Sequence, residues 1–149
     1  MSSGKSSGVF LDFGPILTEW EADFGRTFVL GDDPVKLRLQ ADLPRIWAAG
    51  RAHFDARPGI TGAELYARAV ALAEEAGWEF GGPHSGHLVG EFRHEVIDGE
   101  RIESYVAPGN TTAMRRTDRA GRREVAYGVH EGGVRACREP QRSPNASSR

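Results

Sequence analysis

An α+β fold with an antiparallel sheet is predicted by three features of the first half of the chain. VFLDFG, residues 9–14, is a short apolar run interrupted by one acid, Asp12, which is typical of a buried strand with an inward carboxylate. After Gly14-Pro15, the β-branched and aromatic run TEWEADFGRTFVLG continues to Gly31, which predicts a second strand paired with the first in a hairpin. Two helical patterns follow, so we expect two main helices beside the sheet.

The first helix is expected from Val35 to about Ala56. Asp32-Asp33-Pro34 places an acid at the N-cap and a proline in the first turn. Pro44 should kink this helix or divide it, because proline removes one backbone hydrogen bond and clashes with the preceding turn. Its expected apolar positions, at roughly helical spacing, are Leu39, Leu43, Ile46, Trp47 and Phe54.

The second helix has the clearest end signals. Thr61 and Glu64 have the spacing of a capping box, and Ile60 and Leu65 stand where a hydrophobic staple would lie. Gly77 is the expected left-handed stop. The predicted buried stripe consists of Leu65, Ala69, Leu72, Ala73 and Ala76.

Composition limits the class of protein. A chain of 149 residues is long enough for one domain with a real core, and its net charge of −2 gives no basic footprint for nucleic acid. Cys137 is the single cysteine, which excludes an internal disulfide and a multi-cysteine zinc site. No apolar run approaches the ~20 residues of a membrane-spanning helix, and MSSGKSSG lacks the apolar segment of a secretory signal. We therefore predict a cytoplasmic protein that binds neither nucleic acid nor membrane.

Three regions are expected along the chain. Residues 1–8 are rich in serine and glycine and are predicted to be a disordered lead-in. Residues 9–110 contain the dense apolar pattern and are predicted to be the folded domain. Residues 111–149 are rich in arginine, glycine and serine and are predicted to be a disordered tail.

Candidate functional residues gather in two places. Asp12 and Asp23 lie across the predicted hairpin from each other, so both carboxylates could reach one face, which is unfavourable unless a cation neutralises them. Surface positions for both acids remain an equally simple interpretation. GGPHSGHLVGEFRHE, residues 81–95, adds His84, His87 and His94. His84 is expected in a loop, whereas either of the others could be a ligand or a hydrogen-bonded structural histidine.

FLDFG, EADFGRTF and GHLVGEFRHE together resemble, in order and spacing, the motifs of the pita-bread metallopeptidases, the family of methionine aminopeptidase, aminopeptidase P and prolidase. RPGITGAELYARAVALAEEAGW, residues 57–78, is similar to the family helix between the second aspartate and the Gly-His loop. The resemblance covers residues 9–109. It implies part of a pita-bread fold and hydrolysis of an N-terminal peptide bond. Within the family, the PGITG linker favours the Xaa-Pro peptidases.

The resemblance also implies a dinuclear metal site. By matching positions, Asp12 would bind one metal and Asp23 would bridge two, while His87 would bind the other through a ring nitrogen. His94 would act as the catalytic residue that donates a hydrogen bond to the substrate carbonyl. The implied ions are Mn²⁺ or Co²⁺, with Zn²⁺ or Fe²⁺ as alternatives. The implied partner is a peptide substrate, and formation of a homo-oligomer stays open.

The sequence departs from this pattern at two ligand positions. Ala107 stands in YVAPGN where the family has a glutamate before Pro-Gly, and an alanine side chain cannot coordinate. Glu131 is the nearest candidate for the final bridging glutamate, but its surroundings lack a strand pattern. The chain also starts at the family's first metal-binding strand, which suggests a truncated or frame-shifted descendant. Three interpretations remain open: an active metallo-aminopeptidase, an inactive peptidase-like module that binds peptide, and a partly unfolded remnant.

Overall fold

The structure is a computed structural model. Its first feature is a long antiparallel hairpin of β1 (Ser7–Phe13) and β4 (Phe24–Leu30). The register pairs Ser7 with Leu30 and Phe13 with Phe24. A second short ladder, β2 (Ile16–Leu17) with β3 (Trp20–Glu21), lies between these strands in sequence. The predicted hairpin is therefore confirmed. The structure describes residues 6–18, 20–21, 24–88, 102–117, 123–125 and 134–135.

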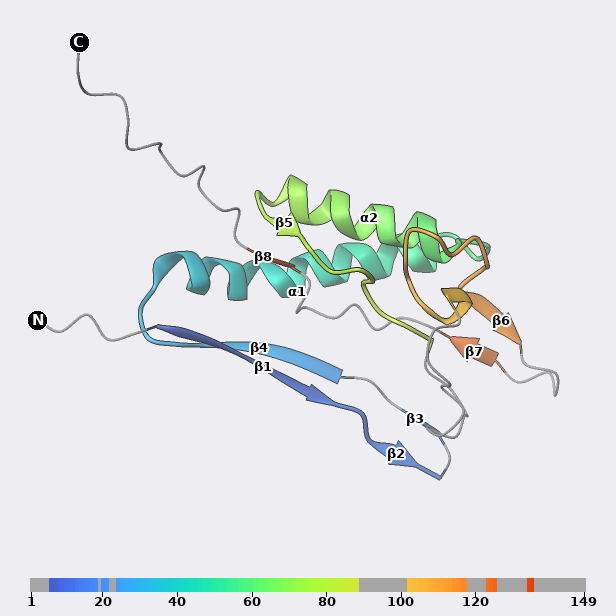
Figure 1. Cartoon of the computed structure of the whole chain (residues 1–149), viewed down its shortest axis with the longest axis horizontal. Coiled ribbons are helices and arrows are strands. Elements are labelled where there is room, and N and C mark those ends of the chain that lie inside the picture. Colours follow the sequence, from blue (N-terminus) through green and yellow to red (C-terminus); the bar gives the residue numbers. More distant parts are fainter. Residues whose placement is uncertain are drawn as a thin grey trace, which may run out of the picture.

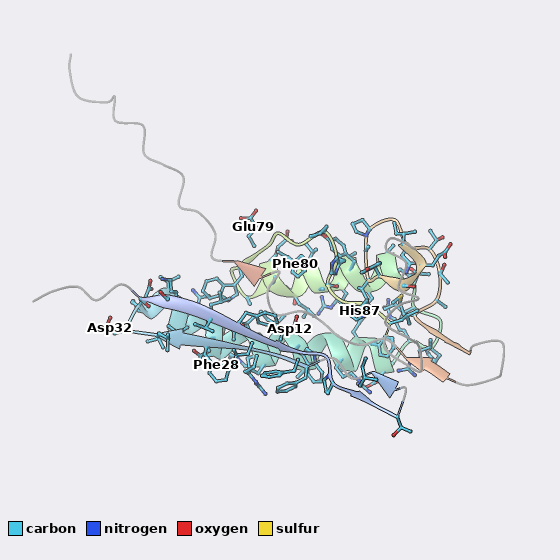
Figure 2. The ribbon with its side chains drawn as sticks, turned by 60° about the horizontal axis from the view of Figure 1, so that its bottom comes forward. Asp12, Phe28, Asp32, Glu79, Phe80 and His87 are labelled. Atoms are coloured by element: carbon cyan, nitrogen blue, oxygen red, sulfur yellow. The ribbon has the colours of Figure 1, made fainter. Side chains whose placement is uncertain are left out.

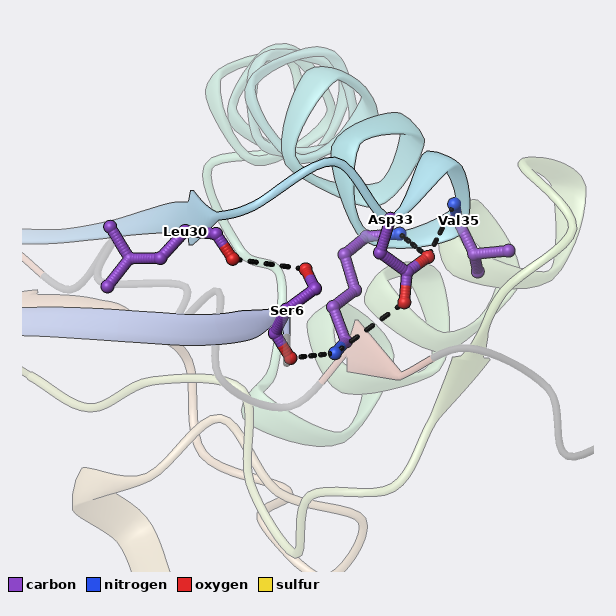
Figure 3. Close-up of polar contacts among 5 residues, drawn as sticks. Ser6, Leu30, Asp33 and Val35 are labelled. Atoms are coloured by element: carbon purple, nitrogen blue, oxygen red, sulfur yellow. Dashed lines mark hydrogen bonds and ion pairs between the residues drawn. The ribbon is translucent and has the colours of Figure 1, made fainter. Parts of the chain in front are cut away.

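Helix α1 (Pro34–Asp55) begins at the predicted cap. The carboxylate of Asp33 accepts hydrogen bonds from the backbone N–H groups of Val35 and Lys36, at 3.0 and 3.3 Å. Figure 3 shows how this end of the helix holds the start of the hairpin: Lys36 Nζ donates to the Ser6 carbonyl at 2.6 Å, and Ser6 Oγ donates to the Leu30 carbonyl. Farther along α1, Gln40 Oε1 accepts from the Val29 N–H at 2.8 Å.

Pro44 does not divide α1, so that alternative was wrong. The helix continues through the proline from Pro34 to Asp55. Leu43 and Ile46 are buried against the second helix and Phe54 is fully buried in the core. Burial on both sides of the proline outweighs its local cost, because each large apolar side chain contributes about 1.5–3 kcal/mol. Trp47, predicted within the apolar stripe, is 38% exposed.

Helix α2 (Gly62–Glu75) follows the sequence prediction closely. Thr61 Oγ1 accepts from the Glu64 N–H, and the Glu64 carboxylate accepts from the Thr61 N–H at 2.9 Å, which completes the capping box. Gly77 has a φ of +79°, the left-handed conformation that favours glycine after a helix. Of the predicted stripe, Leu65, Ala69, Leu72 and Ala73 are buried and Ala76 is partly buried against them.

The two helices pack together and α1 separates α2 from the hairpin (Figure 1). Two clusters of buried apolar residues form the core. One joins the two helices and contains Leu43, Ile46, Leu72, Ala73 and Trp78. The other joins the helix ends to the segments around residues 88 and 106, and contains Phe54, Ile60, Leu65, Leu88, Val106 and Met114.

The remaining described elements are short. Strand β5 (Glu79–Phe80) pairs with β8 (Val134–Arg135), and β6 (Arg115–Thr117) pairs with β7 (Arg123–Val125). The 3₁₀ turn η2 (Ile102–Ser104) precedes the YVAPGN segment. Of the helices that the structure describes, neither is long and apolar enough to cross a membrane.

Candidate functional site

Asp12 lies on β1, opposite Gly25 of β4, and its side chain is exposed. The prediction of a buried strand with an inward carboxylate was therefore wrong, because β1 is exposed along most of its length. Beside it, the ring of Phe10 crosses over Gly25, where an added Cβ would lie 2.6 Å from the ring. Gly25 therefore leaves the space that Phe10 fills. Asp23, the second predicted aspartate, lies outside the described residues, so its predicted position beside Asp12 stays a prediction.

His87 lies on the segment after β5 (Figure 2). It forms an isolated antiparallel β-bridge with Tyr105. Two backbone hydrogen bonds fix this register: Leu88 N donates to the Ser104 carbonyl at 2.8 Å, and Val106 N donates to the Gly86 carbonyl at 2.9 Å. They flank the pair without joining its two members directly, the arrangement in which opposite side chains come closest. The backbone therefore places the side chains of His87 and Tyr105 next to each other.

The His87 ring has a defined tautomer. Its Nδ1 lies 2.9 Å from the carbonyl oxygen of Leu88. Because a carbonyl can only accept, this hydrogen bond requires the proton on Nδ1, which in the neutral ring leaves the lone pair on Nε2. A metal-binding histidine has this arrangement, in which one nitrogen is fixed by a hydrogen bond and the other coordinates. His87 therefore fits its predicted role.

The Tyr105 ring packs against His87 and also against His84. The Tyr105 ring meets the His87 ring edge-on at a centroid distance of 6.2 Å and lies 5.0 Å from the His84 ring. Ser85, between the two histidines, is fully buried, and its hydroxyl has no hydrogen-bond partner among the described residues. His84 lies in a loop, as predicted, and its ring packs against Tyr105.

The YVAPGN segment is fixed by a fully buried asparagine. Asn110 donates from its side-chain amide to the Tyr105 carbonyl at 2.7 Å and accepts from the Thr112 N–H at 2.8 Å. Its own backbone carbonyl accepts from the Ala63 N–H at 2.7 Å, which attaches the segment to the first turn of α2. Ala107, which the motif resemblance predicts at the position of the family glutamate, is 8% exposed.

The described side chains supply part of a donor set for a divalent cation. Among the residues that the structure describes, no three His, Cys, Asp or Glu side chains gather closely enough to hold an ion. Asp12 offers a carboxylate and His87 an imidazole of the required tautomer, both suitable for borderline divalent metals. His94 and Glu131 lie outside the described residues, so the complete set stays a prediction.

The family assignment follows from comparison with known proteins. The sequence model of Metallopeptidase family M24 matches residues 4–123, a range that includes all four predicted site residues. The chain belongs to this family. No curated protein gives a significant match over the sequence.

Solved M24 structures confirm the fold. The dipeptidase of Pyrococcus horikoshii OT3 is 22% identical, with a TM-score of 0.53, and the match covers 83% of this chain and 33% of the dipeptidase. The methionine aminopeptidase of Rickettsia prowazekii is 18% identical, with a TM-score of 0.50, covering 85% and 62%. The chain thus spans about a third of the length of the dipeptidase and somewhat under two thirds of the length of the methionine aminopeptidase. The prediction of part of a pita-bread fold, α+β with two main helices, is confirmed.

Sequence reasoning missed two residues that organise this site. Tyr105 packs on both histidines, and Asn110 holds the Tyr105 backbone by a hydrogen bond to its carbonyl. The signal available was weak: an aromatic residue two positions before Ala107, hence on the same face of an extended segment.

Proposed function

We propose that this M24 family member is a metal-dependent aminopeptidase that removes an N-terminal residue from short peptides. The observation that carries the proposal is the family match over residues 4–123, because it includes Asp12, Asp23, His87 and His94 in one aligned stretch. The hydrogen-bonded orientation of His87 also supports it, since Nδ1 is held against the Leu88 carbonyl and Nε2 is the nitrogen that would coordinate.

Asp12, Asp23 and His87 would hold the ions, with Mn²⁺ or Co²⁺ the expected metals. Carboxylates suit this role because they neutralise paired cations and can bridge them. The bound pair would supply a water of lowered pKa and electrostatic stabilisation of the charge that develops on the substrate carbonyl oxygen. His94 would donate a hydrogen bond to that oxygen. A preference for Xaa-Pro substrates is the finer form of the proposal.

A peptide hydrolysis assay tests the proposal. The purified chain is incubated with Mn²⁺ or Co²⁺ and dipeptides with and without proline in the second position. We expect release of the N-terminal residue, loss of turnover with chelator, and loss in Asp23→Ala and His87→Ala. His53→Ala is the matched control, because His53 lies on α1 and is not among the predicted ligands. Turnover that persists in the His87→Ala variant would contradict the proposed site.

A second candidate function is favoured by Ala107. A methyl side chain on this buried segment offers no oxygen for a metal, so the site would lack one family ligand. The corresponding function is a peptide-binding module without turnover. It predicts that fluorescently labelled peptides bind equally well with and without chelator and are recovered intact.

A further inference from the structure

The Tyr105 side chain contacts both histidines of the described site segment. Its ring centroid lies 5.0 Å from that of His84, tilted by 51°, and 6.2 Å from that of His87, at 68°. Such separations and angles are those of attractive ring contacts. The phenol ring therefore limits the orientations open to the His87 imidazole.

The Tyr105 ring can restrain a neighbour because its own backbone is fixed at three points. Tyr105 N donates to the Ile102 carbonyl at 3.0 Å, and the Tyr105 carbonyl accepts from Asn110 Nδ2 at 2.7 Å. The β-bridge to His87 supplies the third restraint. Each restraint acts on a different group, so the position of the ring is defined by the fold.

A hydrogen bond also restrains the imidazole. His87 Nδ1 is hydrogen-bonded to the Leu88 carbonyl, and this bond is made only in one ring orientation. A ring flip about χ2 would carry Nδ1 away from the carbonyl. The Tyr105 ring opposes that flip because it packs against the imidazole. The hydrogen bond opposes it because the flip would break the bond's favourable geometry.

We propose that Tyr105 is a positioning residue that holds the His87 imidazole in one orientation and one tautomer, so that Nε2 is ready to bind metal. This inference rests on the proposed metal-binding function of His87. It also accounts for the bulky side chain two residues before Ala107. With one family ligand replaced by alanine, metal affinity depends more on how well the remaining ligands are held in place. A ligand that is already held in its binding orientation loses less freedom when it binds metal.

The direct test uses the metal-free full chain and does not depend on metal binding. Nitrogen-15 NMR at about pH 8, where an ordinary imidazole is neutral, reports which His87 nitrogen carries the proton. We expect a predominantly Nδ1–H ring in the wild type and in Tyr105→Phe, which keeps the ring. Tyr105→Leu, which keeps apolar bulk but removes the ring, should give exchange-averaged nitrogen shifts.

Tyr66→Leu is the matched control. Tyr66 is also partly buried, but its hydroxyl donates to the Gly82 carbonyl and its ring contacts Phe80 at 5.6 Å. It should leave the His87 shifts unchanged although it also removes a packed tyrosine. Identical His87 shifts in the wild type and Tyr105→Leu would overturn the inference, as would equal changes in Tyr105→Leu and Tyr66→Leu.

Cobalt affinity gives the second measurement and separates the inference from the proposed function. Titration followed by visible absorption should show Co²⁺ binding weakened about 10-fold in Tyr105→Leu and little in Tyr105→Phe, in the range for groups that orient a ligand. If the wild type bound no Co²⁺ while the NMR difference held, the proposed function would fail and the positioning role would stand. Unequal cobalt affinity with unchanged NMR shifts would reject the positioning role.

Discussion

The side-chain amide of Asn110 donates a 2.7 Å hydrogen bond to the main-chain carbonyl of Tyr105, the residue that pairs with His87. This bond connects the first turn of α2 to the candidate metal ligand, because the Asn110 carbonyl also accepts from Ala63. The helix that the sequence specifies most clearly therefore determines where the site segment lies. Stability and site geometry are coupled through one buried residue, whose backbone contacts α2 and whose side chain contacts Tyr105.

Replacing Asn110 tests this coupling. Asn110 is fully buried. The Asn110→Ala substitution removes the side-chain donor to the Tyr105 carbonyl and the side-chain acceptor of the Thr112 N–H. We expect the free energy of unfolding to fall by about 2–4 kcal/mol, because buried polar groups would lose their partners. Chemical denaturation measures the change, with Asn145→Ala as the control for the same substitution elsewhere. A loss no larger than the control would contradict the coupling.

Gly62 should tolerate no side chain. A Cβ at this position would lie 2.4 Å from Asn110 Nδ2 and 2.6 Å from the Tyr105 carbonyl oxygen. Gly62→Ala should therefore destabilise the chain by about 1–3 kcal/mol through overpacking, although alanine is the better helix former. Gly59→Ala is the matched control, because a Cβ there has no neighbour within 4 Å. Thermal unfolding that ranks the two variants equally would refute the predicted close approach.

Asp42 should make folding stability depend on acid pH. The hydrogen bond from Trp78 Nε1, at 3.0 Å, lowers the pKa of the Asp42 carboxyl; burial opposes this, while Arg45 and then Arg38 reinforce it. The folded-state pKa of Asp42 lies below its ordinary value of 3.8. The ionised carboxylate therefore contributes its full stabilisation of the folded state above pH 3.8, and this stabilisation is lost as the pH falls through the folded-state pKa. Asp42→Asn should therefore lower the unfolding free energy more at pH 7 than at about pH 2.5. Urea titrations at both pH values that show the same difference would disprove the assignment.

Ala107 offers a gain-of-function test. Ala107→Glu restores the carboxylate of the family pattern, and we expect Mn²⁺ affinity to rise at least about 10-fold, the scale on which metal-site groups act. Ala107→Gln is the control, since it has nearly the same volume without the charge. Both longer side chains should lower the metal-free melting temperature, because position 107 is buried. Only the glutamate variant should regain stability with Mn²⁺; an equal response in the two variants would argue against a metal at this position.

The sequence predicted best those features that depend on neighbouring residues. The Asp33 cap, the Thr61–Glu64 capping box and the left-handed Gly77 were all confirmed. Each depends on a few adjacent backbone groups, so the local pattern contains the whole cause. The hairpin prediction was likewise confirmed, because the connection over residues 14–23, which contains the β2–β3 ladder, is shorter than the crossover that parallel pairing needs.

Features set by tertiary packing were harder to predict. Helix α1 is not divided at Pro44, because Leu43 and Ile46 are buried beside it, whereas a kink there stays a prediction. Periodicity placed Trp47 in the apolar stripe, but its side chain is 38% exposed. The contact between Tyr105 and His87 joins segments far apart in sequence, so no spacing rule reveals it. Motif resemblance predicted the family and the role of His87, but it could not show what restrains the ring. The predicted domain boundaries at residues 8 and 110 remain predictions.

The most direct test of the account is metal binding to the chelator-stripped chain, measured by calorimetry with Co²⁺ and Mn²⁺ alongside the melting temperature. The account predicts saturable binding that raises the melting temperature, is lost in Asp23→Ala and His87→Ala, and is retained in His53→Ala. Absence of saturable binding, or binding that survives in His87→Ala, would contradict the claim that His87 is a ligand in an M24 metal site.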